Sequence, residues 1–362
     1  MNIGIPKESR PFEYRVGMTP AGVEILSQNG HMVFVEHEAG AGAEFSDQEY
    51  ERAGARLVYS AEEVFGRADL LLKIAMPLNK EIEWLRPGSI LAGFLHLASS
   101  SQDQIELLIE KEITAVAYEQ ITDSSGSRSV LRPFSKICGT MAAPIAARYL
   151  QNNRGGKGIM LSGMPGVPPA EIVILGGGVV GAAATKTFLG AGAHVTVIDK
   201  ELAVLESLSD RHPGIVTMIS TRRNLEQTTG YADVVVGAVL VSGQRAPVIV
   251  TRDLVKKMKP RSVIIDISID QGGCVETSRP TNHEHPTFIE EGMVHYCVPN
   301  IPGVVARTAS RVFRLSALPY ILEIANQGIH SAIRNNPYIE AAVNVHEGKM
   351  AHLTRLSAQE HA

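Results

Sequence analysis

The sequence predicts an α/β protein with two domains, each built on a parallel β-sheet covered by helices. Its 362 residues are too many for one ordinary hydrophobic core. Short apolar segments alternate with helical patterns along most of the chain, which favours parallel sheets. A glycine-rich turn typical of one such sheet begins only after residue 170, so a region of domain size precedes it.

The composition argues against several classes of function. Hydrophobic residues make up 44% of the chain and charged residues 20%, as in water-soluble globular domains. A net charge of −4 without a basic block argues against a nucleic-acid partner. No stretch approaches the roughly 18 apolar residues of a membrane span, and Lys7 and Glu8 lie where a signal peptide would be apolar. We therefore expect a cytoplasmic protein without a membrane partner.

The cysteines and histidines do not form a recognisable metal-ligand pattern. Cys138, Cys274 and Cys297 give neither a disulfide framework nor the paired spacing of metal ligands. His283 and His285 lie in a polar segment without a third ligand at metal-binding spacing. We therefore expect no metal site.

Residues 1 to about 130 show the alternation that predicts the first sheet. The expected strands are Asn2–Ile5, Met32–Glu36, Asp69–Ile74, Ser89–Phe94 and Thr114–Ala117, and the expected helices are Pro20–Gln28 and Gln102–Lys111. A longer helix, Pro133–Gln151, is expected to connect the two domains. Its apolar residues recur at intervals of four, namely Ile137, Met141, Ile145 and Tyr149.

The most informative segment is a glycine motif after a predicted strand. The apolar run Ile172–Leu175 ends in Gly176, Gly178 and Gly181, spaced as G-x-G-x-x-G, and an alanine-rich helical segment follows. The first glycine permits a tight turn, the second lets a pyrophosphate approach the backbone, and the third lets helix and strand pack closely. The motif therefore predicts dinucleotide binding, with the phosphates at the N-terminus of the helix.

Asp199 favours NAD as the dinucleotide. It ends the next predicted strand, His194–Ile198, 18 residues after the third glycine. A carboxylate at this place binds the ribose hydroxyls of the adenosine and repels a 2′-phosphate. Lys200 and Arg222 keep NADP open as an alternative, because a cation accommodates that phosphate.

Further strands complete the second sheet and leave a C-terminal remainder. They are expected at Ile215–Ile219, Val234–Val239, Val263–Ile267 and Val294–Val298, which gives the six strands of a doubly wound fold. A helical pattern at 307–327 and a short helix from Pro337 follow. Roughly 60 residues rarely form a domain of their own, so we expect them to return to the first domain. The expected division is a discontinuous substrate domain, 1–130 with 307–362, and an NAD-binding Rossmann domain, 131–306.

Two acids near the end of a predicted strand are candidates for chemistry. Asp266 and Asp270 point to the same face if the strand extends that far. A charge on a buried strand is costly unless it is paired or functional. We expect one acid to be structural, and Asp270, nearer the carboxyl end, to be catalytic. Val239 and Leu240 follow another strand at the edge where ligands bind, although plain burial explains them equally well.

His96 and Arg15 are the candidates in the first domain. His96 ends an apolar strand, and histidine is the usual proton carrier near neutral pH. A structural role is the more common one for a single histidine in a strand. Arg15 lies in a loop before a helix, where its guanidinium is suited to binding a substrate carboxylate with two hydrogen bonds. The alternative is a solvated arginine.

Several motifs together resemble the alanine dehydrogenase and transhydrogenase family. They recur in order over nearly the whole chain and include Gly4-Ile5-Pro6-Lys7-Glu8, Tyr14-Arg15-Val16, Phe94-Leu95-His96-Leu97, Pro165-Gly166-Val167 and Ile269-Asp270-Gln271-Gly272-Gly273-Cys274. The resemblance implies an NAD-linked conversion between L-alanine and pyruvate with ammonia, in a homo-oligomer that is usually a hexamer. It also implies a discontinuous first domain.

The resemblance assigns roles to individual residues. Arg15 corresponds to the arginine that binds the substrate carboxylate, His96 to the catalytic histidine and Asp270 to the catalytic aspartate. Beside the glycine motif, the implied cofactor contacts are Ser135, Asp199, Ser220, Val239, Leu240, the segment from Ile267 to Asp270, and the segment from Val298 through Asn300 to Ile301. Lys200, next to Asp199, is a further candidate cofactor contact.

One substrate-binding position departs from the family pattern. The family has a lysine that contacts the substrate, followed by a glutamate, where this chain has Ala75 and Met76. Phe134 replaces a methionine near the cofactor. A donor of this kind typically contributes about 2.7–4 kcal/mol in the transition state. Lys73 lies two residues earlier, roughly 7 Å along the strand, and is the candidate substitute for substrate binding.

These residues leave three functions open. The first is an NAD-dependent amino-acid dehydrogenase of the alanine dehydrogenase type for an amino acid and its 2-oxo acid, with the usual or an altered substrate. The second is an imine reductase or dehydrogenase for a substrate larger than alanine. The third is a catalytically silent NAD-binding protein. The joint retention of Arg15, His96 and Asp270 argues against the third.

Overall fold

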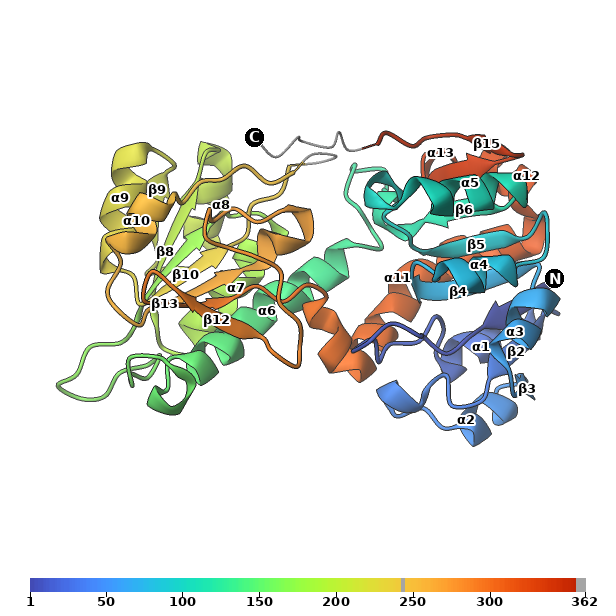
Figure 1. The fold of residues 1–362 in the computed structure, drawn as a ribbon, viewed down its shortest axis with the longest axis horizontal. Coiled ribbons are helices and arrows are strands. Elements are labelled where there is room, and N and C mark those ends of the chain that lie inside the picture. Colours follow the sequence, from blue (N-terminus) through green and yellow to red (C-terminus); the bar gives the residue numbers. More distant parts are fainter. Residues whose placement is uncertain (242–244, 356–362) are drawn as a thin grey trace. The chain divides into compact units, whose positions relative to one another are not determined.

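The computed structural model describes residues 1–241 and 245–355. The chain divides into two compact units. The first contains Met1–Phe134 and the segment from Pro302 onward, and the second contains Ser135–Ile301. Residues 356–362, which we expected to end the substrate domain, lie outside the described residues. The two sheets and their helices are drawn in Figure 1.

The first unit is built on an eight-stranded sheet in the order β15-β14-β6-β5-β4-β1-β2-β3. Neighbouring strands from β3 to β6 are parallel, whereas β14 pairs antiparallel with β6 and β15 antiparallel with β14. The strands are β1 (Asn2–Ile5), β2 (Met32–Glu36), β3 (Arg56–Val58), β4 (Leu70–Ala75), β5 (Ile90–Phe94), β6 (Thr114–Ala117), β14 (Val343–His346) and β15 (Lys349–Met350). The C-terminal segment therefore returns to the first sheet.

Helices pack on this sheet through buried apolar residues. Val64 and Phe65 of α3, Ile82 of α4 and Leu108 of α5 share one hydrophobic cluster with strand residues such as Leu71. The helices of the unit are α1 (Pro20–Gln28), α2 (Asp47–Arg52), α3 (Ala61–Arg67), α4 (Asn79–Glu83), α5 (Gln102–Glu110), α11 (Ala306–Gln327), α12 (Ile329–Asn335) and α13 (Pro337–Glu340).

The second unit is built on a seven-stranded sheet in the order β12-β13-β11-β10-β7-β8-β9. Six strands are parallel in the doubly wound arrangement, and β12 pairs antiparallel with β13. The strands are β7 (Glu171–Leu175), β8 (His194–Asp199), β9 (Val216–Ile219), β10 (Val234–Gly237), β11 (Val263–Asp266), β12 (Thr287–Glu290) and β13 (Met293–Tyr296). The helices are α6 (Arg132–Tyr149), which begins in the first unit, α7 (Val179–Gly190), α8 (Leu202–Arg211), α9 (Arg222–Tyr231) and α10 (Arg252–Lys256).

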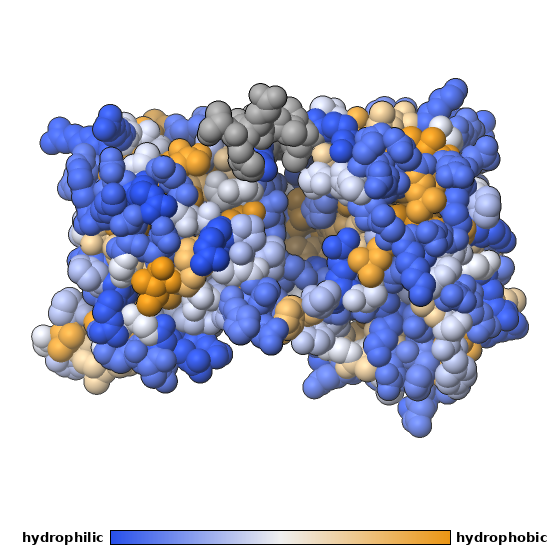
Figure 2. Space-filling view, in the orientation of Figure 1, coloured by the Kyte–Doolittle hydropathy of each residue, from blue (hydrophilic) through white to orange (hydrophobic). Residues whose placement is uncertain are grey.

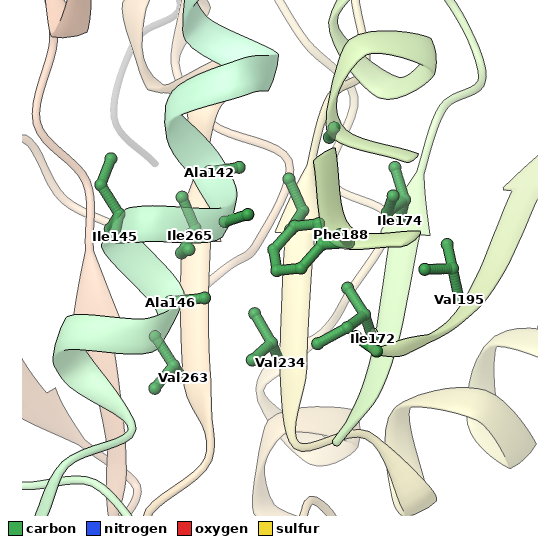
Figure 3. Packing of buried hydrophobic residues seen from close by; sticks show 14 of the residues in the cluster. Ala142, Ile145, Ala146, Ile172, Ile174, Phe188, Val195, Val234, Val263 and Ile265 are labelled. Atoms are coloured by element: carbon green, nitrogen blue, oxygen red, sulfur yellow. The ribbon is translucent and has the colours of Figure 1, made fainter. Parts of the chain in front are cut away.

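The central strands of the second sheet are buried on both faces. Successive residues of β7 belong to different clusters, with Ile172 and Ile174 in one and Val173 in the other. Figure 3 shows Phe188 of α7 beside Ile172 and Val234 in the first of these clusters. Burial on both faces explains why these strands are continuous apolar runs in the sequence and not alternating patterns.

The surface seen in Figure 2 is mainly hydrophilic, with hydrophobic residues in separate groups. Within the described ranges, no helix combines the length and apolarity that crossing a bilayer requires.

The predicted fold class, with two Rossmann-like domains and a discontinuous first domain, is confirmed by this architecture. Several local expectations differ from it. The chain after Pro337 forms only one helical turn before β14 and β15, and the strands β3, β12, β14 and β15 were not predicted. The strand β11 ends at Asp266, and residues 267–271 form a 3₁₀ turn, so Asp270 is not on the strand.

Candidate active site

The glycine turn of the second unit has the geometry of a phosphate-binding turn. Gly176 has a φ of 95°, which a side chain would disfavour. A Cβ atom on Gly181 would lie 1.8 Å from the carbonyl oxygen of Gly176, so helix and strand approach too closely for any other residue. A Cβ atom on Gly178 would meet no atom within 4 Å. Gly178 is also the N-cap of α7, and no side chain caps that helix.

Asp199 holds this turn in place from the end of β8. Its Oδ2 accepts a hydrogen bond from the backbone N–H of Gly177 at 2.6 Å, and its Oδ1 accepts one from Glu201 at 2.9 Å. The acid is partly exposed at the carboxyl end of the sheet, beside the glycine turn. An anionic acceptor here fits ribose hydroxyls, which donate hydrogen bonds, and it does not fit a 2′-phosphate.

The ends of β10 and β11 are joined by hydrogen bonds. The backbone N–H of Val239 donates to Ser268 Oγ at 3.0 Å, and that hydroxyl donates to the carbonyl oxygen of Val239 at 2.9 Å. Asp266 is 1% exposed and accepts hydrogen bonds from the N–H groups of Ser268, Cys274 and Val275. Burial raises the pKa of Asp266, and the hydrogen bonds from the N–H groups of Val275 and Cys274 act against that rise. Asp266 is therefore the structural acid of the pair.

Asp270 is exposed on the 3₁₀ turn beyond β11. Ile267, on the same turn, is buried, and Leu240 beyond β10 is 56% exposed. Both turns follow the carboxyl ends of parallel strands, which is the edge where ligands bind in such sheets. Asp270 therefore occupies the edge expected for a group that acts on a ligand.

The remaining predicted cofactor residues also belong to the second unit. Ser220 follows β9, and its N–H donates to the carbonyl oxygen of Asp199 at 2.9 Å. Lys200 is highly exposed, with its Nζ 3.8 Å from Glu201. Val298 is buried after β13, and Asn300 has a positive φ of 57°. Ser135 lies on α6, a helix that precedes all the strands of this sheet in the sequence.

In the first unit, Arg15 is fixed by Glu13. Nε and NH2 of Arg15 donate to the two carboxylate oxygens of Glu13 at 2.6 and 2.5 Å. Arg15 is only 8% exposed and Glu13 only 7%. The guanidinium carbon lies 5.3 Å from the ring centroid of Phe134. This bidentate pair fixes the plane of the guanidinium before any ligand binds.

His96 is positioned by Glu119. It has a φ of 46°, in the left-handed region, immediately after β5. Its backbone N–H donates to Glu119 Oε1 at 2.7 Å, and its Nδ1 lies 3.8 Å from the same oxygen. The His96 side chain is 63% exposed, whereas that of Glu119 is 10% exposed. A buried acid thus anchors the backbone of His96, whose imidazole is accessible.

Ring contacts link Arg15 to His96 through Phe134 and Phe94. The ring of Phe94 lies 6.5 Å from that of His96 and 5.0 Å from that of Phe134, which faces Arg15. Tyr118 and Phe313 complete this group, which we call the aromatic cluster: Phe94, Tyr118, Phe134 and Phe313. Ala75 is the register partner of Phe94 in the pairing of β4 and β5 and is half-buried.

Lys73 is enclosed and paired with two acids. Its side chain is 1% exposed, and its Nζ lies 3.2 Å from Glu8 and 3.8 Å from Glu81. Burial raises the pKa of Glu8, and Lys73 opposes that rise. The pairing of β4 with β5 shifts register between Leu72 and Ala75, so simple alternation of faces does not hold here. A role for Lys73 in substrate binding stays a prediction and requires that its ammonium leave these carboxylates.

Met76 has a packing role. It is 6% exposed and belongs to the hydrophobic cluster that contains Phe65 and Ile82. Its side chain therefore fills the core of the first unit, and the apolar character of this position follows from packing alone.

Glu13 and Glu119 were not predicted from the sequence. Each is a buried acid that holds a candidate site residue. The sequence did contain a sign of both acids: Glu119 is a charged residue just after the apolar strand β6, and Glu13 lies two residues from Arg15. A buried carboxylate requires a partner, and in both cases the partner is the predicted residue.

Two family models match the chain. The model described as "Alanine dehydrogenase/PNT, N-terminal domain" matches residues 4–138, and "Alanine dehydrogenase/PNT, C-terminal domain" matches residues 142–353. The chain is 43% identical to an alanine dehydrogenase of Halomonas elongata, covering 97% of this chain and 95% of that protein. The identity to an alanine dehydrogenase of Mycobacterium tuberculosis is 41%, covering 97% and 94%.

Solved structures give the same result. A structure of L-alanine dehydrogenase superposes with a TM-score of 0.94 at 40% identity, covering 97% of both chains. A transhydrogenase from Sinorhizobium meliloti superposes with a TM-score of 0.84 at 26% identity, covering 97% of this chain and 99% of that one.

Proposed function

Because this chain belongs to the alanine dehydrogenase/PNT family, we propose that it transfers hydride between NAD and the Cα atom of an amino acid. The family recognised from the sequence motifs is confirmed, and so is the class of enzyme, an oxidoreductase acting on the CH–NH2 group. The cofactor, the substrate and the roles of individual residues are the parts that we propose.

The choice of NAD is supported by the glycine turn and Asp199. The open space at Gly178 and the uncapped N-terminus of α7 suit a pyrophosphate. Asp199, which is anchored to Gly177, offers carboxylate oxygens to ribose hydroxyls. When bound, NAD supplies the hydride acceptor for oxidation of the amino acid and, as NADH, the hydride donor for reduction.

The candidate residues divide the remaining work. Arg15 binds the substrate carboxylate, and Glu13 keeps its guanidinium oriented. His96 takes a proton from the water that adds to the oxidised Cα and returns it in the reverse direction. Asp270 orders that water or the ammonia. The observation that carries this proposal is that Arg15 and His96 are each held by a buried acid and that each contacts a ring of the aromatic cluster, Phe134 and Phe94 respectively.

We further propose a substrate with a larger side chain than that of alanine. Ala75, the register partner of Phe94, has a methyl group at the position of the family's substrate-binding lysine. Phe134, at the position of a methionine, contacts both Phe94 and Arg15. Apolar surface at this place favours an amino acid with an aliphatic or aromatic side chain. Cyclic imines of similar size are the second candidate class.

A substrate panel tests the proposal. Purified protein is assayed with NADH or NADPH, ammonium and a series of 2-oxo acids of increasing side-chain length, and with cyclic imines. We expect NADH to be preferred and a larger oxo acid to be preferred over pyruvate. A preference for pyruvate contradicts the enlarged substrate but not the dehydrogenase. Tight NADH binding without turnover of any substrate supports a silent NAD-binding protein instead.

The cellular location and the assembly are further parts of the proposal. A cytoplasmic enzyme and a homo-oligomer, usually a hexamer, rest on the family resemblance. The molar mass in solution measures the assembly directly.

A further inference from the structure

A group of three side chains in the first unit has no role in the proposed reaction. His330 lies near the start of α12, His346 ends β14, and Glu347 follows it in the hairpin turn to β15. One ligand atom from each lies within 4.8 Å of the other two. Figure 1 shows α12 and β15 at the same end of this unit. Segments 16 residues apart in sequence thus bring two imidazoles and a carboxylate together.

The distances suit a small metal ion after a slight closure. Glu347 Oε1 lies 3.8 Å from His330 Nδ1 and 3.8 Å from His346 Nε2. Zinc bonds of about 2.0–2.1 Å in tetrahedral geometry separate neighbouring ligand atoms by about 3.3 Å. The side chains of His330 and Glu347 are 68% and 72% exposed, so rotation about their side-chain bonds supplies this adjustment.

His346 is already oriented as a metal ligand. Its Nδ1 is hydrogen-bonded to Thr114 Oγ1 of the neighbouring strand β6 at 2.9 Å, which directs Nε2 toward Glu347. Histidine ligands usually have such a second partner on the other ring nitrogen. The His346 side chain is 21% exposed, so this ligand is the fixed one of the three.

We propose that His330, His346 and Glu347 bind a divalent transition-metal ion of the zinc class, with solvent in the remaining position. Two imidazoles and one carboxylate are a common zinc ligand set. Hard cations such as Mg²⁺ prefer oxygen ligands and are excluded by the same donors. A bound ion links α12 to the hairpin of β14 and β15, and so ties the C-terminal strands to the helix that precedes them.

Zinc titration of the full, untagged protein tests the site. The protein is stripped with a chelator and titrated with Zn²⁺ by calorimetry, and thermal unfolding is followed with and without Zn²⁺. We expect saturable binding of one Zn²⁺ ion per chain. The unfolding temperature should rise when this site is filled. His330→Gln and Glu347→Gln should each weaken this binding at least tenfold and remove the thermal shift.

A matched histidine–glutamate pair serves as the control. In the second unit, His194 Nδ1 lies 3.1 Å from Glu171, with the histidine side chain 62% exposed. His194→Gln should leave Zn²⁺ binding unchanged, and Mg²⁺ should not compete with Zn²⁺ in the parent protein. Comparable unfolding temperatures of His330→Gln and the parent without metal exclude a folding defect. Unchanged Zn²⁺ affinity in His330→Gln, or no saturable binding at millimolar Zn²⁺, overturns the proposal.

Discussion

Glu119 holds His96 by its backbone, not mainly by its ring. The backbone N–H of His96 donates to Glu119 Oε1 at 2.7 Å, whereas the ring nitrogen Nδ1 lies 3.8 Å from that oxygen. The hydrogen bond fixes a residue whose φ of 46° lies in the left-handed region, which is uncommon for residues other than glycine. Among the described residues, Glu119 Oε2 is buried without a hydrogen-bond partner, which is costly for a structural acid. We therefore regard Glu119 as a positioning residue for His96.

Glu119→Ala should lower kcat by about 10- to 100-fold, because the loop carrying His96 loses its anchor. Glu119→Gln should recover part of that loss, since its amide oxygen still accepts the backbone N–H. The KM for NADH should stay near that of the parent, because the predicted NADH contacts lie in the other unit. Steady-state kinetics and urea unfolding measure these effects. A loss of stability that parallels the loss of kcat would instead assign Glu119 to the fold.

Two glycine substitutions in the nucleotide turn should have different consequences: one should lower stability and the other should weaken NADH binding. Gly181→Ala places a methyl group 1.8 Å from the carbonyl oxygen of Gly176, so helix and strand must separate. We expect a stability loss of about 1–3 kcal/mol in urea unfolding. Gly178→Ala meets no atom within 4 Å and has an ordinary φ of −63°, so the fold should be retained. NADH binding should nevertheless weaken about tenfold or more, because the methyl group occupies the space expected for the pyrophosphate.

Binding of NADH to Gly178→Ala is measured by titration of nucleotide fluorescence, alongside the parent. Parent-like affinity in this variant would mean that the pyrophosphate does not approach Gly178. The glycine turn would then be only a close contact between helix and strand.

The sequence predicted the strands that are continuous apolar runs and the helices that have an apolar stripe. The helix α1 and the strands β2 and β6 have the predicted bounds, and the alternation of β7 between two cores explains the continuous run in its sequence. The strand β12 was missed because its residues are at best half-buried and lie between polar segments. An exposed edge strand has no continuous apolar signal.

The sequence indicated single candidate residues, whose roles stay predictions, and gave no sign of contacts that combine several segments. The pairing of Lys73 with Glu8 and Glu81 joins three separate segments, and no local pattern in the sequence identifies it. The same is true of His330 and His346, which are adjacent only because β14 returns to the first sheet. Such contacts depend on the topology of the sheet and not on spacing along the chain.

Ala75→Lys tests the proposed substrate preference. The substitution puts a lysine at the register partner of Phe94, the position at which the family has one. Activity with pyruvate should rise by as much as about 100- to 1,000-fold, because one such donor is worth about 2.7–4 kcal/mol in the transition state. Activity with the larger oxo acid should fall, since a charge replaces apolar surface. Ala75→Met, of similar length and without charge, should lower activity with the large substrate and give no gain with pyruvate. Equal gains in both variants would show that volume, not charge, determines the preference.

Asp233 should stabilise the second unit in a pH-dependent manner. It is 5% exposed and accepts hydrogen bonds from Lys157 Nζ at 2.5 Å, Lys259 Nζ at 3.1 Å and the N–H of Glu171 at 3.0 Å. Burial acts to raise the pKa of Asp233, but these hydrogen bonds outweigh it and hold the pKa below its ordinary value. The charged form is therefore favoured by folding, and Asp233→Asn should cost about 1–2 kcal/mol at pH 7, because solvent screens the partly exposed lysines.

The stabilisation by Asp233 has a definite direction with pH. In the unfolded chain an aspartate titrates at about 3.9, so the contribution is complete above that pH. It is lost as the pH falls through the lower pKa of the folded state. Urea unfolding of the parent and Asp233→Asn should therefore differ at pH 7 and begin to converge as the pH falls below about 4. Glu226→Gln, which removes an exposed pair with Lys257, is the matched control and should change the free energy of unfolding little at either pH. A difference between the parent and Asp233→Asn that persists unchanged at pH 3 would assign the effect to packing of the side chain and not to its charge.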